Sequence, residues 1–334
     1  MKELNQEQEN NWVRWITRNK HNGVNDLALL KVMLGKGFEK DQAQSLLSTI
    51  SSHPIFEASK QRAWRAKNLE SLLNVQLELQ YLNPENIKIE RRSNLSNEEF
   101  QNLYYLSNKP VIITDLMDNW QAMKLWSPEY FRNKLGNMMI DIQSGRTGKP
   151  VYEVFLKGHT KKVTMKEYVD LVLSDSNTDE FYLTANDRLL ENEEAKPLLD
   201  DFYPFPEYLD PSNVNRKQFL WFGPKGAVSP LHRDRLNVFM TQVSGRKRVR
   251  LISPYALHLV YNFESFFSEV DVENPDLERF PLFKKVKMID LTLKPGEVLL
   301  IPVGWWHHVR SLDITISVSF TNFKLNNDFE DCYK

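Results

Sequence analysis

The second half of this sequence is a succession of short strand patterns separated by turns, and this succession limits the fold most strongly. From Gln218 onward, apolar or alternating runs are divided by turn residues such as Ser244-Gly245 and Pro295-Gly296. The last run alternates apolar residues with threonine and serine, which is the period of a β-strand. Many short strands with regular turns are typical of a jelly roll or barrel. We predict strands at residues 219–222, 238–243, 247–252, 287–293, 297–301 and 314–320.

The first 84 residues differ from this pattern and are predicted to be helical. A helix is expected after Asp26, which we interpret as its N-cap, and another over residues 40–50. A long amphipathic helix is predicted over residues 57–81, and Asn83-Pro84 would end it. Its apolar face would carry Leu69, Leu72, Leu73 and Leu77. We therefore predict a helical N-terminal region at 1–84, with a scaffolding or interaction role, and a β-rich domain at 85–334.

Between these parts, short helices and strands alternate. Ser96 with Glu99 and Thr164 with Glu167 match the capping-box pattern, so each pair predicts a helix start. Ser127-Pro128 predicts another start, with serine as the cap and proline at the first helical position. Strands are expected at residues 111–113 and 181–183.

Composition excludes some classes of protein and partner. The formal net charge of -1 and the absence of a basic stripe argue against nucleic acid as an obligate partner. No run of about 18 apolar residues occurs, so no membrane-spanning helix is expected. Cys332 is the only cysteine, and the polar N-terminus lacks the apolar stretch of a secretory signal. These features predict a cytoplasmic protein, and they indicate no particular oligomeric state.

A metal-binding pattern lies within the strand-rich half. In His232-Arg233-Asp234, residues i and i+2 of a strand would point to the same side, with Arg233 facing outward. A third ligand from His307 or His308 would complete a facial triad, and neighbouring residues do not decide between these two histidines. Two histidines and one carboxylate suit iron(II), because open coordination positions remain for a co-substrate and dioxygen. A structural zinc site is the weaker alternative, since no cysteine is nearby.

At these residues the sequence resembles the JmjC-type oxygenases, which depend on iron(II) and 2-oxoglutarate. Within them it is most similar to the protein hydroxylases related to JmjC domain-containing protein 5, an arginyl hydroxylase, and factor inhibiting HIF, an asparaginyl hydroxylase. The resemblance covers residues 87–320 and is densest after residue 219. The matching stretches are WFGP at 221–224, SPLHRD at 229–234, QVSGRK at 242–247, DVENPDLERFP at 271–281, LKPGEVLLIPVGWWHHVRSLD at 293–313 and SVSF at 317–320.

The resemblance implies a fold, a reaction and a set of binding residues. The fold would be a double-stranded β-helix of the cupin type, with helical additions. The resemblance selects His307 as the third metal ligand and leaves His308 in contact with solvent or packed outside the barrel. Lys247 would bind the distal carboxylate of 2-oxoglutarate, with contacts from Tyr182 and Ser229. Dioxygen would be consumed, a C–H bond hydroxylated, and succinate and carbon dioxide released.

Two positions depart from the family pattern. An asparagine often stands six residues after the first ligand histidine, where it can contact the co-substrate. Here that position is Val238, and Asn237 lies one residue earlier, so the contact is either restored by a local shift or lost. The relatives often continue the last strand with two tryptophans, whereas Thr321-Asn322 stands here. That difference puts in doubt a direct transfer of their substrate pockets.

The resemblance favours a side chain of a protein or peptide as the substrate, with arginine preferred weakly. Residues that would line the pocket rim are Asp141, Gln143 and Arg146, on one predicted strand, together with Trp221 and Arg235. Three other functions stay open: a non-catalytic cupin-like binding module with a vestigial metal site, a metal-dependent cupin of another activity such as an isomerase, and a hydroxylase of a small molecule or tRNA base. Lys247 and Tyr182 favour the oxygenase, because only a 2-oxoglutarate enzyme needs partners for a distant carboxylate.

Overall fold

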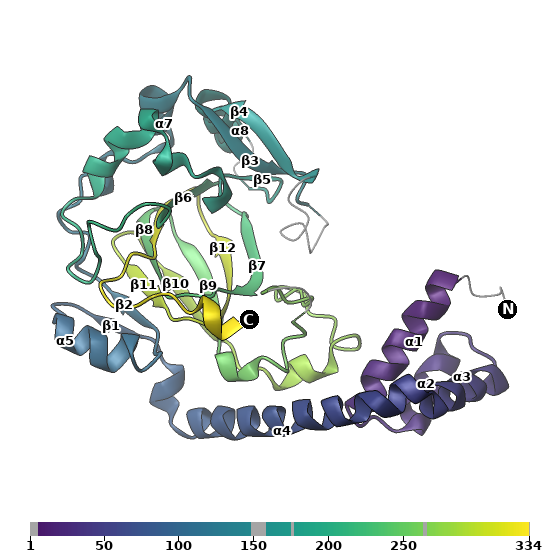
Figure 1. The fold of residues 1–334 in the computed structure, drawn as a ribbon. Helices are drawn as coiled ribbons and strands as arrows, with labels where there is room; N and C mark the ends of the chain where they lie inside the picture. The colour runs from purple at the N-terminus through teal and green to yellow at the C-terminus, as the bar shows by residue number, and fades with distance from the viewer. Residues whose placement is uncertain (1–5, 148–157, 175–176, 263–265, 334) are drawn as a thin grey trace. The chain divides into compact units, whose positions relative to one another are not determined.

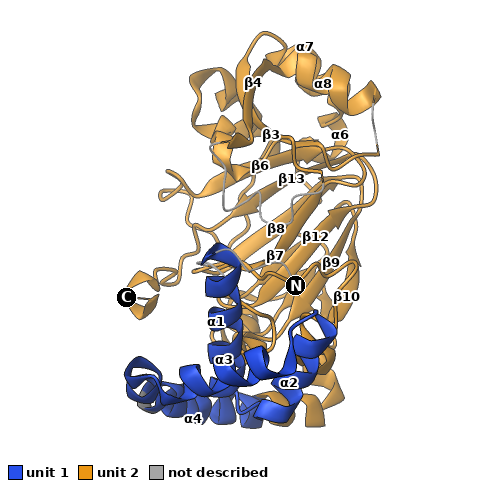
Figure 2. Cartoon of the chain, turned by 90° about the vertical axis from the view of Figure 1, so that its right-hand side faces the viewer, with its two compact units in different colours: residues 1–76 blue, residues 77–334 orange. Residues whose placement is uncertain are grey.

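The chain forms two compact units, residues 1–76 and 77–334, in a computed structural model (Figure 2). The structure describes residues 6–147, 158–174, 177–262 and 266–333. Because compactness does not establish independent folding, the domain boundary expected after residue 84 stays a prediction.

Unit 1 is helical, as predicted. Its small core contains Ile16, Met33 and Leu47, and it is extended by the edge-to-face contact between the rings of Trp12 and Phe38, whose centroids lie 4.9 Å apart. The predicted cap Asp26 is instead the first helical residue. Asn25 is the N-cap, because its extended backbone lets its side-chain oxygen accept a hydrogen bond from the backbone N–H of Ala28 at 2.9 Å. The helices are α1 (Gln6–His21), α2 (Asp26–Gly35), α3 (Lys40–Ser52) and α4 (Pro54–Leu82), of which α4 continues into unit 2.

The long helix α4 forms as expected, but the single apolar face predicted for it does not. Leu69 and Leu72 are 63% and 64% exposed, Leu73 is half-buried and only Leu77 of the four leucines is buried. Leu77 and Tyr81 pack into a hydrophobic cluster of unit 2. The leucine spacing was therefore a poor guide, because burial of α4 depends on what lies beside each of its turns rather than on periodicity alone.

Unit 2 is built around two facing sheets. Among the described residues, one sheet has the strand order β1-β2-β11-β8-β13-β6 and the other β10-β9-β12-β7 (Figure 1). A smaller sheet, β4-β3-β5, lies beyond β6. The strands are β1 (Glu90–Arg92), β2 (Val111–Ile113), β3 (Met139–Ser144), β4 (Thr160–Thr164), β5 (Phe181–Tyr182), β6 (Gln218–Gly223), β7 (Val228–Arg233), β8 (Val238–Ser244), β9 (Lys247–Ile252), β10 (Ile289–Leu293), β11 (Val298–Ile301), β12 (Trp306–Ser311) and β13 (Thr315–Phe320).

The pairing of these strands confirms the predicted jelly roll with helical additions. Strands β6 to β13 alternate between the two sheets except at β9 and β10, which pair with each other in the four-stranded sheet. Every pair formed among these strands is antiparallel. All six predicted strands of this half are present. The list of predicted strands omitted β7 and β12, whose mixed polar sequences lack an apolar run because they carry the candidate site.

Among the described residues of unit 2, three buried clusters pack against the barrel. Leu251 and Val309 from one sheet pack against Leu299 and Ile301 from the other, so part of the barrel interior is filled by side chains. A second cluster covers the outer face of β7 and β12 and includes Leu231 and Trp306. The largest cluster covers the outer face of the six-stranded sheet, so all residues of β13 are buried and its alternation separates two buried faces.

Three helices of unit 2 begin where caps were predicted, at Ser96, Ser127 and Thr164. Ser96 and Glu99 form a reciprocal capping box, Thr164 and Glu167 exchange the same bonds, and the Ser127 hydroxyl accepts from the backbone N–H of Tyr130. No helix in the described part of the chain has both the length and the apolar character needed to cross a membrane. The helices are α5 (Asn97–Phe100), α6 (Ala122–Leu125), α7 (Pro128–Leu135) and α8 (Met165–Ser174).

We expect Leu77→Ala to lower the free energy of unfolding of unit 2 by about 2–4 kcal/mol, because it leaves a cavity in a packed cluster. Leu79→Ala, on the same helix, is the matched control. Its side chain is 54% exposed whereas that of Leu77 is 3% exposed, so its cost should stay within about 0.5 kcal/mol. Urea unfolding followed by tryptophan fluorescence measures both. Equal effects of the two substitutions would contradict the packing of Leu77.

Candidate functional site

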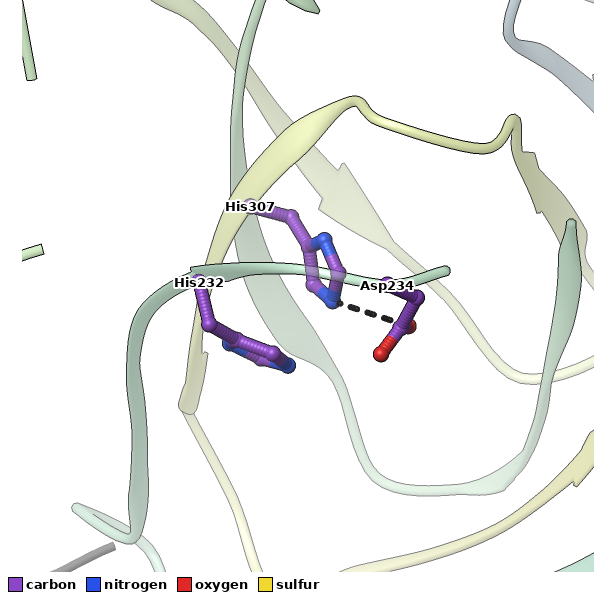
Figure 3. A group of neighbouring side chains, drawn as sticks. All are labelled: His232, Asp234 and His307. Atoms are coloured by element: carbon purple, nitrogen blue, oxygen red, sulfur yellow. Dashed lines mark ion pairs between the residues drawn. The ribbon is translucent and has the colours of Figure 1, made fainter. Parts of the chain in front are cut away.

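Three side chains, two on neighbouring strands and one just beyond a strand end, converge at one point of unit 2 (Figure 3). His232 lies on β7, Asp234 follows the end of that strand, and His307 lies on β12. Because β7 and β12 are antiparallel neighbours, their register sets His307 directly beside His232. The imidazole centroids are 4.1 Å apart, and Nε2 of His307 lies 3.6 Å from Oδ2 of Asp234. One ligand atom of each residue lies within 4.8 Å of the others.

Backbone carbonyl groups orient both imidazoles. Nδ1 of His232 lies 2.7 Å from the Pro230 oxygen, and Nδ1 of His307 lies 3.1 Å from the Trp305 oxygen. Since a carbonyl oxygen only accepts hydrogen bonds, each Nδ1 is the donor, and Nε2 is the nitrogen of each ring that is placed to bind a metal. Burial, with a smaller contribution from His232, lowers the pKa of His307 to about 4. His307 is therefore neutral near pH 7, the state in which imidazole binds a metal.

The triad opens into a cavity of about 420 Å³, to which all three residues contribute. Two imidazole nitrogens and a carboxylate oxygen on one side of a cavity are the donor set that suits iron(II) with open coordination positions. No cysteine lines the cavity in the described part of the chain, so a closed thiolate zinc site does not fit. The apolar part of the wall consists of Ala185, Phe219, Trp221, Leu236, Val238, Met240, Ile301 and Val309.

Lys247, the first residue of β9, also lines the cavity and is 2% exposed. Its ammonium donates to the hydroxyl of Ser317 at 2.6 Å and to that of Tyr182 at 3.3 Å. Among the described residues, no carboxylate forms an ion pair with it, and burial lowers its pKa to about 7. An ammonium that is buried without a counter-ion is costly, and an anionic ligand in the cavity would remove that cost. The site therefore fits a carboxylate co-substrate as well as a metal.

Two glycines make room for this arrangement. Gly245, in the turn between β8 and β9, has φ of +71°, and a Cβ there would lie 2.1 Å from the Ile314 oxygen. Gly223, at the end of β6, would place a Cβ 2.5 Å from the ring of Tyr182. A larger residue at either position would displace Lys247 or Tyr182.

The structure brings some predicted binding residues to the cavity and excludes others. Tyr182, Ser229, Trp221 and Arg235 line it. Asn237 does not, because its amide nitrogen donates to Asn327 at 2.9 Å and its oxygen accepts from the backbone N–H of Val303 at 2.9 Å. Val238 lines the cavity in its place, so no local shift restores the asparagine contact.

Gln143 and Arg146 were predicted to line the rim of the pocket, and this prediction is wrong. Arg146 lies beyond the end of β3 at Ser144, and both side chains are buried instead of lining the cavity. Nη1 of Arg146 donates to the Gln143 oxygen at 3.0 Å, and its Nη2 pairs with Asp179 at 3.1 Å. Asp141 is also absent from the cavity wall. Polar and charged side chains were expected at the rim of the pocket, but the contacts of Arg146 with Gln143 and Asp179 allow these side chains to be buried.

Two residues beside the ligands face away from the cavity and are packed. His308 points away from the cavity, as strand alternation requires, and it is 2% exposed, so of the two expected alternatives it packs outside the barrel. Burial, assisted by Arg250, lowers its pKa to about 3. Arg233 faces away from the triad, but its guanidinium lies over the rings of Phe266 and Trp306 at 5.1 and 5.6 Å. The outward face of this strand is therefore packed.

Sequence reasoning missed several cavity residues. They include Phe219 on β6, Met240 on β8 and Ser319 on β13. Each lies two residues from another residue that lines the cavity or contacts Lys247: Trp221, Val238 and Ser317, respectively. The period of two along a strand was thus the available signal. Arg216, which precedes β6, carried no such signal.

Known proteins are similar to this chain in sequence. Residues 96–327 match the family described as "Cupin-like domain". The chain is 33% identical over 232 residues to "Lysine-specific demethylase 8" of Xenopus tropicalis and 35% identical over 247 residues to "JmjC domain-containing protein D" of Dictyostelium discoideum, each match covering 67% of this chain. It is 28% identical over 238 residues to "Jumonji C domain-containing protein 5" of Drosophila melanogaster, again over 67% of this chain.

The chain spans only about half the length of these relatives, with 50%, 53% and 57% of them covered. The match nevertheless includes every residue of the triad and Lys247. The predicted resemblance is confirmed at the level of the family. The chain therefore belongs to the cupin-like JmjC family of oxygenases, whose cofactors are iron(II), 2-oxoglutarate and dioxygen.

Proposed function

We propose that this protein is a hydroxylase that uses iron(II) and 2-oxoglutarate to oxidise a side chain of a protein or peptide. The observation that carries the proposal is the buried ammonium of Lys247 in the same cavity as an open His-Asp-His triad. A metal site alone would fit many cupins, but an ammonium without a carboxylate partner is the group that a dicarboxylate co-substrate needs at its far end.

Each residue has a distinct part in this proposal. His232, Asp234 and His307 would hold the metal through Nε2, a carboxylate oxygen and Nε2. Lys247 would bind the distal carboxylate of 2-oxoglutarate, and Tyr182 and Ser229 would donate hydrogen bonds to it. When bound, iron(II) with 2-oxoglutarate supplies the oxidation, in which dioxygen is divided between succinate and the hydroxylated substrate, with loss of carbon dioxide.

The walls of the cavity serve the same reaction. The apolar side chains of Phe219, Trp221 and Met240 exclude water from the open side of the triad, which protects a reactive centre from unproductive oxidation. Ser317 accepts a hydrogen bond from the Lys247 ammonium at 2.6 Å and so restrains its position. These residues orient Lys247 and shield the metal site from water, and they take no part in proton transfer.

A protein substrate is supported by the relatives. "Lysine-specific demethylase 8" is named for action on lysine, whereas the resemblance noted above favours arginine. Arg216 and Arg235 line the cavity, and Asp234 is the only acidic residue of the cavity wall in the described part of the chain. Since Asp234 would be committed to the metal, we favour a target side chain without positive charge over arginine.

The metal ligands can be tested by spectroscopy. We expect anaerobic iron(II) and 2-oxoglutarate to give a visible charge-transfer band with the wild-type chain and none with His232→Ala, because one of its ligands is removed. His53→Ala, which changes an exposed histidine of unit 1, should leave the band intact. A band in His232→Ala equal to that of the wild type would refute the triad.

The role of Lys247 predicts a pH dependence. Its pKa of about 7 lies below the ordinary value, and a bound carboxylate would raise it, so binding takes up a proton above pH 7. The affinity for 2-oxoglutarate should therefore fall as pH rises from 7 to 9, by up to about tenfold per pH unit. Lys247→Met should bind on the order of 100-fold more weakly at pH 6.5 and lose this slope. Parallel slopes in the two proteins, measured by calorimetry at saturating metal, would contradict the assignment.

Turnover is tested with cell proteins as candidate substrates. We expect the wild-type chain, but not His232→Ala, to add about 16 Da to a target residue in an oxygen-dependent reaction, as insertion of one oxygen atom requires. Mass spectrometry of peptides detects the change, and succinate release measures co-substrate consumption. A metal-loaded wild type that releases no succinate and modifies no protein would favour a non-catalytic binding module.

A further inference from the structure

We propose that Arg146 is a positioning residue, which holds Tyr182 and the start of β7 in the geometry that binds the distal carboxylate of 2-oxoglutarate. This inference rests on the proposed function. The guanidinium lies outside the cavity wall, so Arg146 acts through other residues rather than on the co-substrate itself. It joins three segments that are far apart in the sequence: the end of β3, residues 179–182, and the first residue of β7.

The first connection is to Tyr182. The guanidinium carbon of Arg146 lies 5.1 Å from the centre of the Tyr182 ring, and Gly223 lies against the same ring where no Cβ would fit. The hydroxyl at the end of that ring lies 3.3 Å from Nζ of Lys247. A cation over an aromatic face attracts its electron density and holds the ring against rotation away from that face. Arg146 therefore helps to fix where the phenol hydroxyl points.

The second connection is to β7. Nη2 of Arg146 donates to the backbone oxygen of Val228, while Asp179, paired with the same Nη2 at 3.1 Å, accepts from the backbone N–H of Val228 at 2.8 Å. The Arg146–Asp179 ion pair thus binds both the backbone oxygen and the backbone N–H of Val228. Val228 directly precedes Ser229, which lines the cavity. The strand that begins here carries His232 four residues after Val228.

The cost of this arrangement argues for a role beyond stability. The Arg146 side chain is fully buried, and that of Asp179 is 26% exposed. A buried ion pair commonly contributes no more to stability than apolar side chains of the same size would, because both charges lose their hydration. What such a pair provides is fixed geometry, since a planar guanidinium bonds only in set directions. Here those directions set the positions of Tyr182 and Val228.

The test compares two 2-oxo acids in the full-length chain loaded with nickel(II), which does not turn over. 2-Oxoglutarate has a distal carboxylate and pyruvate has none, so only the former should depend on Tyr182 and Lys247. We expect Arg146→Gln to raise the calorimetric Kd for 2-oxoglutarate about tenfold and to leave that for pyruvate unchanged. Arg279→Gln, which removes an exposed guanidinium that pairs with Glu269, is the matched control and should alter neither.

A double-mutant cycle separates positioning from general damage. In a Tyr182→Phe background, the further effect of Arg146→Gln on 2-oxoglutarate should shrink to about threefold or less, because the main contact through which Arg146 acts is already gone. Arg146→Lys keeps the positive charge and the aliphatic part of the side chain but lacks the planar guanidinium. This variant tests the positioning role if Arg146→Gln does not fold. We expect Arg146→Lys to weaken 2-oxoglutarate binding while its melting temperature stays close to that of the wild type.

The possible outcomes distinguish this inference from the proposed function. A wild type that binds 2-oxoglutarate no better than pyruvate overturns the proposed function, and the positioning role with it. A wild type that prefers 2-oxoglutarate, with Arg146 variants that keep the same preference, overturns the positioning role alone. Equal losses for both 2-oxo acids would mean that Arg146 supports the fold in general, which also contradicts the proposal.

Discussion

The pairing of β7 with β12 is the constraint on which the rest of this structure depends. It sets His232 beside His307, although 75 positions separate them in the sequence, and it leaves Asp234 just beyond the strand end. The outer faces of the same strands carry Leu231 and Trp306, which are buried in a hydrophobic cluster. Apolar packing on one face thus fixes the register, and the register assembles polar ligands on the other.

The cavity contains a buried positive charge, Lys247, in addition to the candidate metal site. Lys247 is buried beside hydroxyl groups and without a carboxylate partner among the described residues, and the glycine at 245 lets the chain turn tightly enough to place it there. Such an arrangement destabilises the protein without ligand and favours an anion. This buried cation distinguishes a 2-oxoglutarate enzyme from other cupins, because metal binding alone does not require a positive charge elsewhere in the cavity.

Arg146 illustrates how far the support of the site extends. The residue was expected at the pocket rim because Asp141, Gln143 and Arg146 share one predicted strand that could line the pocket. It is instead enclosed by Gln143, Asp179 and Tyr182, where its fork can bond in several directions at once. The small sheet β4-β3-β5 is thereby connected to the barrel strand that carries the metal ligands, and precision at the cavity depends on residues that do not line it.

Local patterns in the sequence determined the strands with apolar or alternating runs, the helix starts at Ser96, Ser127 and Thr164, and the His-x-Asp unit, because each depends on neighbours a few residues away. His307 could be separated from His308 only through the family resemblance. Tertiary structure alone decided that Asn237 turns away from the cavity, that Arg146 is buried and that Leu69 and Leu72 of α4 remain exposed. Those outcomes depend on which distant segments lie beside each side chain, and sequence spacing does not encode such contacts.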